Sequence, residues 1–232
     1  MYLGIDLSTS ELKALLLDAS HQILASVGEP LTLQRPQPLW SEQQPADWWA
    51  ACARALQRLA AAQPAGMAQV RALALSGQML GAVLIDANGA PLRPAILWND
   101  GRSAAECDEL QRRVLRLQSI TGNLAMPGLT APKLLWVARH EPAVFARIDG
   151  VLLPKDWLRL QLTGERISDM SDAAPARCGW TWPPGAGARS CWTSAACSCR
   201  RCRGWLRAVP PAARCCRRWQ GAGVCRAALA LP

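Results

Sequence analysis

Residues able to bind phosphate stand close together at the start of the chain, between two apolar runs. Asp6 ends the first run, Thr9 and Ser10 follow in a short polar turn, and Lys13 opens the second run. Backbone amides and hydroxyl groups in a turn bind anions, and a neighbouring carboxylate holds a metal ion through water. The spacing favours a phosphate and metal site, although an ordinary turn between antiparallel strands has the same pattern.

A second group of polar and aromatic residues lies further along the chain. Gln78 and Met79 come directly after the apolar run 70–76, and the segment 98–102 reads Trp-Asn-Asp-Gly-Arg. Ligands of open α/β sheets lie beyond the carboxyl ends of the strands. We therefore expect Asp6, Gln78 and Met79 to meet at one end of a sheet, with the segment 98–102 facing them.

The elements that must hold these residues follow the order strand, strand, strand, helix, strand. Three strands are expected within residues 2–27, and apolar residues recur at helical spacing over 46–62. The almost continuous apolar run 70–76 is typical of a central strand covered on both faces. This order predicts an α/β fold with a mixed sheet flanked by helices. Further elements are expected at 82–85 and 150–153 as strands, and at 103–117, 133–140 and 155–162 as helices.

Charge and cysteine content divide the chain in two. The net charge is +9, yet no Asp or Glu follows Asp172, and ten Arg lie from Arg177 onward. Eight of the ten cysteines also follow that point. Residues 1–174 are thus nearly neutral, and the basic charge belongs to the tail. No apolar run reaches the roughly 18 residues that span a bilayer, and the first residues carry no basic export signal. We expect a cytoplasmic protein without membrane association.

Short segments in a fixed order characterise residues 1–174. They are GIDL at 4–7 with Thr9 and Ser10, GQM at 77–79, LWNDGR at 97–102, TGNL at 121–124, GLTAPKLLWVARH at 128–140, LPKD at 153–156 and SDMSDAA at 168–174. This series resembles the FGGY carbohydrate kinases, and among them the bacterial xylulokinases. The resemblance implies an actin-like, ribonuclease-H-like ATPase domain with a mixed five-stranded sheet. It also implies ATP-dependent phosphorylation of D-xylulose with Mg²⁺ as the metal.

The resemblance assigns a role to each candidate residue. Asp6 would order Mg²⁺ through water and support catalysis, while the phosphates would contact Thr9, Ser10 and Lys13. The sugar would be bound by Gln78, Met79, Leu80, Trp98, Asn99 and Asp100. Lys13 also fits a solvated strand residue, and Met79 also fits a core residue. Leu80 stands where xylulokinases usually have a His that bonds the sugar, so another pentulose or a related sugar or polyol is the alternative substrate.

The resemblance ends at Ala174, where the composition changes, and a shifted reading frame explains both. Trp has one codon and Cys has two, so parts of the alternative frame can be rebuilt. In that frame Trp180-Thr181 gives Asp, Trp182-Pro183 gives Ala, and Cys191-Trp192-Thr193 gives Leu-Asp. Family members continue with Gly-Thr-(Leu/Met)-Trp-Leu-Asp-Val and later Leu-Leu-Asp, which the alternative frame allows. We interpret residues 1–174 as an incomplete kinase domain and 175–232 as an unstructured out-of-frame tail.

Because the proton-accepting Asp of the family lies downstream of residue 174, we expect this chain to lack turnover. An active kinase would require that the frame break is a sequence error or is bypassed in translation. The tail also has two other interpretations. Cys197, Cys199 and Cys202 could form a zinc knuckle, but no His follows them. Arg interleaved with Trp could make the chain a non-catalytic basic binding protein. We expect only salt-sensitive, non-specific binding of polyanions there, and the oligomeric state is left open.

Overall fold

The protein is described by a computed structural model over residues 1–115, 117–168 and 172, so the expected out-of-frame tail lies outside the described residues. The strands are β1 (Tyr2–Leu7), β2 (Glu11–Leu17), β3 (Ile23–Pro30), β4 (Glu42–Gln43), β5 (Ala72–Gly77), β6 (Val83–Ile85), β7 (Ala95–Ile96) and β8 (Gly150–Leu152). The helices are α1 (Pro45–Ala62), α2 (Pro64–Ala68), α3 (Ala104–Arg113), α4 (Leu117–Thr121), α5 (Thr130–His140), α6 (Pro142–Phe145) and α7 (Pro154–Thr163).

The main sheet has the strand order β3-β2-β1-β5. Strands β1 and β2 form an antiparallel hairpin in which Asp6 lies opposite Lys13, and β5 runs parallel to β1 with Ser76 beside Asp6. Gly77 ends β5 where a Cβ atom would lie 2.8 Å from the Leu7 carbonyl oxygen. Only glycine allows the two backbones to approach so closely. The carboxyl ends of β1 and β5 therefore lie side by side, as the sequence predicted.

Helix α1 forms where local signals for a helix coincide. Pro45 occupies its first turn, where the missing N–H is not needed, and Asp47 lies at its positive end. The buried stripe consists of Trp48, Ala51, Cys52, Ala55, Leu56 and Leu59. It has the helical spacing expected from the sequence, and Pro64 directly follows the residue that ends the helix. The predicted range 46–62 is confirmed to within one residue.

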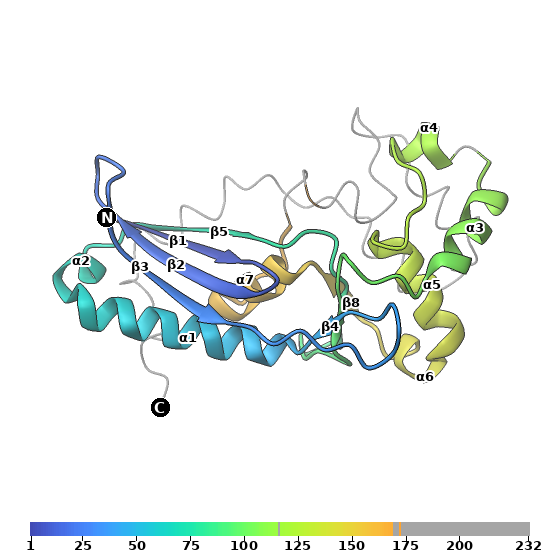
Figure 1. Cartoon of the computed structure of the whole chain (residues 1–232), viewed down its shortest axis with the longest axis horizontal. Helices are drawn as coiled ribbons and strands as arrows, with labels where there is room; N and C mark the ends of the chain where they lie inside the picture. The colour runs from blue at the N-terminus through green and yellow to red at the C-terminus, as the bar shows by residue number, and fades with distance from the viewer. Residues whose placement is uncertain (116, 169–171, 173–232) are drawn as a thin grey trace.

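One face of the main sheet and helices α1 and α7 enclose the principal core. Alternate residues Leu3, Ile5 and Leu7 of β1 point to this face, and Figure 1 shows α1 running along the sheet. Trp48 of α1 meets Trp157 of α7 edge to face, with ring centroids 6.2 Å apart. The opposite side of β1 presents Gly4 and Asp6, which are only half-buried. The core thus leaves the polar residues of the hairpin on the face away from α1.

The mixed sheet with flanking helices agrees with the prediction, but its strand count and the place of β5 differ. Four strands pair in the main sheet of the described residues, not five. The chain turns away from the sheet at Leu80, so β6 pairs with β8 rather than continuing the sheet. The expectation that 70–76 is a central strand covered on both faces is wrong for the described residues. Strand β5 is the edge strand there, with Leu73 and Leu75 half-buried toward the core.

A smaller region adjoins one end of the sheet. It contains the two-stranded pairs β4-β7 and β6-β8, and helices α3 to α6 gather at the same end of the molecule in Figure 1. An isolated bridge between Ala82 and Ile96 connects the two pairs. The expected helix 103–117 is shorter, because α3 ends at Arg113. None of the helices described by the structure is long and apolar enough to cross a membrane.

Candidate functional site

The predicted phosphate residues lie at the turn end of the β1–β2 hairpin. Asp6 and Lys13 are cross-strand neighbours on the same face, and Ser8 Oγ donates a hydrogen bond to Asp6 Oδ2 at 2.7 Å. Thr9 is half-buried and Ser10 is exposed in the turn that follows. Within the described residues no group of three or more potential ligand side chains could hold a metal ion directly. A single carboxylate beside hydroxyl groups and an ammonium group fits a metal held through water next to phosphate oxygens.

An acidic residue shares this face and competes for the ammonium group. Lys13 Nζ lies 3.0 Å from Glu11 Oε1, and both side chains are nearly half exposed. The Glu11 carboxylate lies over Gly28 of β3, where a Cβ atom would be only 2.7 Å from Oε2. Exposed ion pairs of this kind contribute little to stability. Lys13 can therefore leave Glu11 when a more highly charged anion is present.

Gln78 connects the phosphate turn to the core rather than lying open to solvent. Its Oε1 accepts a hydrogen bond from Thr9 Oγ1 at 3.4 Å, and its Nε2 donates to Gln43 Oε1 at 3.0 Å. Gln43 Nε2 in turn donates to the Thr9 carbonyl at 2.7 Å, and Trp48 Nε1 donates to Gln43 Oε1 at 3.1 Å. Sequence reasoning missed Gln43. Two glutamine amides thus fix the turn against α1.

Trp98 reaches the same turn from a distant part of the sequence. Its Nε1 donates to Thr9 Oγ1 at 3.0 Å, while 47% of the residue stays exposed. Met79, which follows Gln78, is 56% exposed, so it is not a core residue in this structure. Asn99 is exposed beside Trp98. The predicted sugar residues Gln78, Met79, Trp98 and Asn99 therefore lie on two segments that meet at Thr9.

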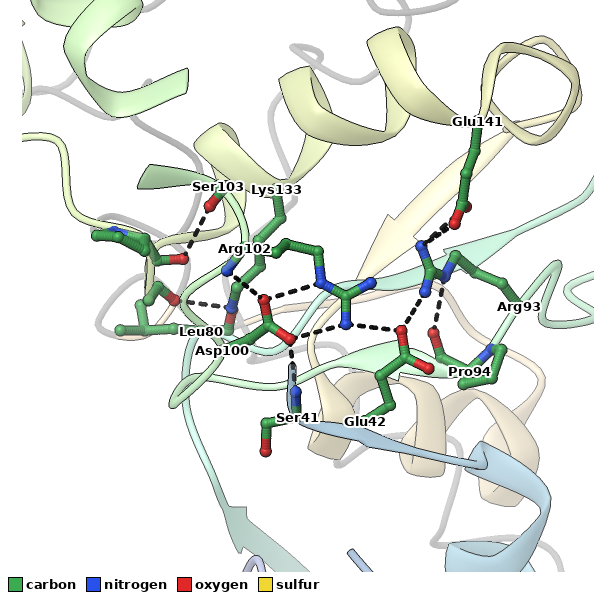
Figure 2. Close-up of polar contacts among 12 residues, drawn as sticks. Ser41, Glu42, Leu80, Arg93, Pro94, Asp100, Arg102, Ser103, Lys133 and Glu141 are labelled. Carbon is green, nitrogen blue, oxygen red and sulfur yellow. Dashed lines mark hydrogen bonds and ion pairs between the residues drawn. The ribbon is translucent and has the colours of Figure 1, made fainter. Parts of the chain in front are cut away.

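Asp100 has a different position from its neighbours because its carboxylate is buried. Figure 2 shows it between Ser41 and Arg102. Oδ2 accepts from the Ser41 amide at 2.6 Å and from Arg102 Nη2 at 2.7 Å, and Oδ1 accepts from the Arg102 amide and Nε. Only 2% of Asp100 is exposed. In this arrangement the carboxylate holds the loop that carries Trp98, and a contact of Asp100 with a sugar hydroxyl stays a prediction.

Arg102 and Arg93 extend this buried ionic network. Glu42 of β4 pairs with both arginines, at 2.7 Å in the case of Arg102 Nη2, and Arg93 Nη1 also pairs with Glu141 at 2.8 Å (Figure 2). Burial lowers the pKa of Arg93, and the nearby carboxylates of Glu42 and Glu141 oppose that shift. The Arg102 guanidinium also lies 3.6 Å from the centroid of the Trp40 ring. The network fixes the loop 98–102 to β4 and to the end of α5.

Leu80 has an unusual backbone conformation that neighbouring residues hold in place. Its φ is +63°, a value that non-glycine residues rarely adopt. Its carbonyl accepts hydrogen bonds from Thr130 Oγ1 and Lys133 Nζ, each at 2.9 Å, and its amide donates to Asp172 Oδ1 at 3.4 Å. Its side chain packs beside a hydrophobic cluster formed by α3, α5 and nearby loops. The backbone of the predicted sugar segment is thus fixed from both sides.

Lys133 is fully buried in α5, the helix that the sequence predicted at 133–140. Its Nζ donates to the carbonyls of Leu80 at 2.9 Å and Gly128 at 2.8 Å. Desolvation lowers the pKa of Lys133 to about 7, opposed by the charge of Asp100, while Arg102 lowers the pKa further. The signal in the sequence was a lysine within the apolar stripe of the helix, next to Leu134 and one turn before Val137.

Ser168 and Asp172, the two described residues of the segment SDMSDAA, lie beside the segment LPKD at 153–156. Lys155 Nζ lies 3.0 Å from Asp156 Oδ1 and 3.2 Å from Asp172 Oδ2, and Ser168 Oγ donates to Asp156 Oδ2. Burial raises the pKa of Asp172, while its ion pair with Lys155 acts in the opposite direction. Through the Leu80 amide, this cluster is linked to the predicted sugar segment.

Comparisons with known proteins identify the family of this chain. The FGGY family of carbohydrate kinases, N-terminal domain, matches residues 1–178. A xylulose kinase of Escherichia coli K12 is 58% identical over 174 residues, which cover 75% of this chain and 36% of that protein. A xylulose kinase of Bacillus subtilis is 37% identical over 173 residues, covering 74% of this chain and 35% of that protein.

Solved structures agree with this family. The xylulose kinase from Rhodospirillum rubrum superposes with a TM-score of 0.78 at 32% identity, covering 83% of this chain and 40% of that chain. A glycerol kinase from Plasmodium falciparum shares the fold, with a TM-score of 0.71 at 22% identity over 75% of this chain and 37% of that chain. The chain belongs to the FGGY family of carbohydrate kinases and contains the N-terminal domain. The expected actin-like α/β fold is confirmed, and the chain spans about a third of the length of the two relatives named above, 36% and 35%.

Proposed function

We propose that the chain is the N-terminal lobe of a sugar kinase that transfers a phosphoryl group from ATP to D-xylulose, forming D-xylulose 5-phosphate. The observation that carries this proposal is the pair of hydrogen bonds that join Thr9 to Gln78 and to Trp98. They connect the phosphate turn to the two segments expected to hold the sugar. The names of the similar kinases support the substrate.

Phosphoryl transfer depends mainly on positioning and on electrostatic stabilisation. ATP with Mg²⁺ would supply the phosphoryl group when bound. In this chain Asp6 would hold the metal ion through water, and the hydroxyl of Thr9, the amide of Ser10 and the ammonium group of Lys13 would contact phosphate oxygens. The exposed Trp98 ring would cover an apolar face of the sugar, and Asn99 would meet its hydroxyl groups. Gln78 would hold the turn 8–10 in place through its hydrogen bonds with Thr9 and Gln43.

We further propose that residues 1–174, taken without a second lobe, bind sugar without turnover. The proton-accepting Asp of the family lies downstream of residue 174, and no Asp or Glu follows Asp172 in this sequence. A carboxylate that accepts the proton of the attacking hydroxyl is part of the mechanism. The change of composition after Ala174 and the rebuilt alternative frame support a shifted reading frame as the reason. Re-reading the gene across the codons for residues 174–177 tests that explanation.

A different pentulose, sugar or polyol is the second candidate substrate. Leu80 carries a side chain that neither donates nor accepts hydrogen bonds, at the position where xylulokinases usually have a His. An unpaired sugar hydroxyl there would reduce affinity by roughly 1–3 kcal/mol. A ligand with no hydroxyl at that point would bind without this loss.

The test uses the purified 232-residue chain with ATP, Mg²⁺ and a small panel of D-xylulose, D-ribulose and xylitol. We expect saturation-transfer NMR to detect weak binding of at least D-xylulose, and a coupled assay to detect no sugar-dependent ADP. Sugar-dependent ADP would refute the proposed lack of turnover while supporting the kinase assignment. Absence of binding by every member of the panel would refute the sugar site.

A further inference from the structure

Lys133 connects the two segments that carry the exposed side chains of the candidate sugar site, the first directly at Leu80 and the second through Gly128. Its Nζ donates to the Leu80 carbonyl, one residue after Met79 (Figure 2), and to the Gly128 carbonyl in the loop before α5. Gly128 in turn packs directly on Trp98, because a Cβ atom at Gly128 would lie 2.6 Å from the Trp98 carbonyl oxygen. One ammonium group therefore sets the separation between the backbones next to Met79 and next to Trp98.

Burying a cation at this position lowers the stability of the fold. Burying an ammonium group without a carboxylate partner is strongly unfavourable. Within the described residues no carboxylate lies at ion-pair distance from Lys133, and the charges that act on it are those of Asp100 and Arg102. An apolar side chain such as Met would fill the same space between α5 and its neighbours without that cost. Fold stability alone does not account for a lysine here.

The Leu80 backbone explains what the ammonium group does. A φ of +63° places Leu80 in the left-handed region, which a leucine leaves unless its surroundings prevent it. Two donors from α5, Thr130 Oγ1 and Lys133 Nζ, converge on its carbonyl at 2.9 Å. Both side chains are essentially inaccessible to solvent. They hold the carbonyl in the direction that this conformation requires.

We propose that Lys133 and Thr130 are positioning residues that hold the segment 78–80 at a fixed distance from Trp98, so that a sugar fits between Met79 and the indole ring. Neither residue touches the sugar. Only the identity of the ligand as a sugar rests on the proposed function. The positioning of residues 78–80 is a property of this chain and can be tested without a ligand.

The test combines local hydrogen exchange with sugar binding in the full chain. Lys133→Met removes the ammonium group at similar volume, and Thr130→Val removes the hydroxyl at similar shape, whereas Thr130→Ser keeps it. We expect Lys133→Met and Thr130→Val to raise amide exchange in peptides covering residues 77–83 by about tenfold and to weaken D-xylulose binding by about tenfold. The urea midpoint of Lys133→Met should stay equal to wild type or rise. Thr130→Ser should behave as wild type.

Arg166→Met is the matched control. Arg166 also donates to two backbone carbonyls, those of Asp86 and Ala87, but it lies on the exposed surface and not beside residues 78–80. Its replacement should leave exchange at 77–83 unchanged. If Lys133→Met does not fold, the positioning role is tested by comparing amide exchange at 77–83 and D-xylulose binding between Thr130→Val and Thr130→Ser.

Three results separate the possible failures. Unchanged exchange at 77–83 in both variants would overturn the positioning role. Equal acceleration in α1 together with a lower urea midpoint would show a merely structural role and overturn it too. Faster exchange confined to 77–83, with no sugar bound even by wild type, would support the positioning of the segment and refute the sugar assignment.

Discussion

Asp100 and Lys133 illustrate how differently two buried ionic groups next to the candidate site are compensated. Asp100 receives four hydrogen bonds from the part of the chain that the structure describes, three of them from Arg102, so its charge is well satisfied. Among the described residues, Lys133 has no carboxylate partner and donates to two neutral carbonyl groups instead. Its pKa consequently falls to about 7. The lysine therefore exchanges its proton near neutral pH, while the carboxylate is held in its loop.

This difference predicts how stability depends on pH. Unfolded Lys133 keeps its proton up to about pH 10.5, the ordinary value, whereas the folded protein loses it near pH 7. Between these values the unfolded state binds more protons, so stability rises with pH. From pH 7 to 9.5 the contribution of Lys133 to the free energy of unfolding should increase on the order of 3 kcal/mol. Urea unfolding at both pH values measures it.

The control is Lys133→Met, which lacks the titrating group. Between pH 7 and 9.5 the free energy of unfolding should rise less in this variant than in wild type, by on the order of 3 kcal/mol. Equal pH dependence of the two proteins would contradict the lowered pKa. The sequence alone indicated none of this, because it shows that Lys133 lies in an apolar stripe but not which carbonyl groups converge on it.

Local signals made α1 predictable, and its energetics follow from its buried stripe. Pro45, Asp47 and the helical spacing of apolar residues all lie within the segment itself. The place of β5 was not predictable in the same way, because an apolar run does not say which strands lie on either side of it. The turn at Leu80 likewise depends on donors from α5, fifty or more residues away. Structure that depends on residues within one segment could be predicted, whereas contacts with distant segments could not.

The packing of α1 on the sheet gives a prediction about stability. Leu59 is 0% exposed in the principal core, so Leu59→Ala should lower the free energy of unfolding by about 2–5 kcal/mol. Ile23 at the start of β3 is 62% exposed, so Ile23→Ala should change the free energy of unfolding by no more than about 0.5 kcal/mol. Urea denaturation compares the two. Similar losses for both variants would mean that α1 does not pack as described.

At the scale of the whole molecule, three distant parts of the chain converge on one turn. The β1–β2 hairpin supplies Thr9, the end of β5 supplies Gln78, and the loop before α3 supplies Trp98. The sequence predicted this meeting from the carboxyl ends of the strands and from the family resemblance. It did not predict Gln43 or the buried network around Asp100, because those contacts depend on side chains brought together only by the fold.

The indole N–H of Trp98 reports on this convergence most directly, since it donates to Thr9 at the centre of the candidate site. Its resonance can be followed in ¹⁵N-labelled protein during a titration with D-xylulose and assigned by its loss in Trp98→Phe. The account predicts a saturable shift of this resonance with D-xylulose, and none with an equal concentration of a disaccharide too large for the site. A resonance that stays unchanged up to high D-xylulose concentration would contradict the assignment of this site to a sugar.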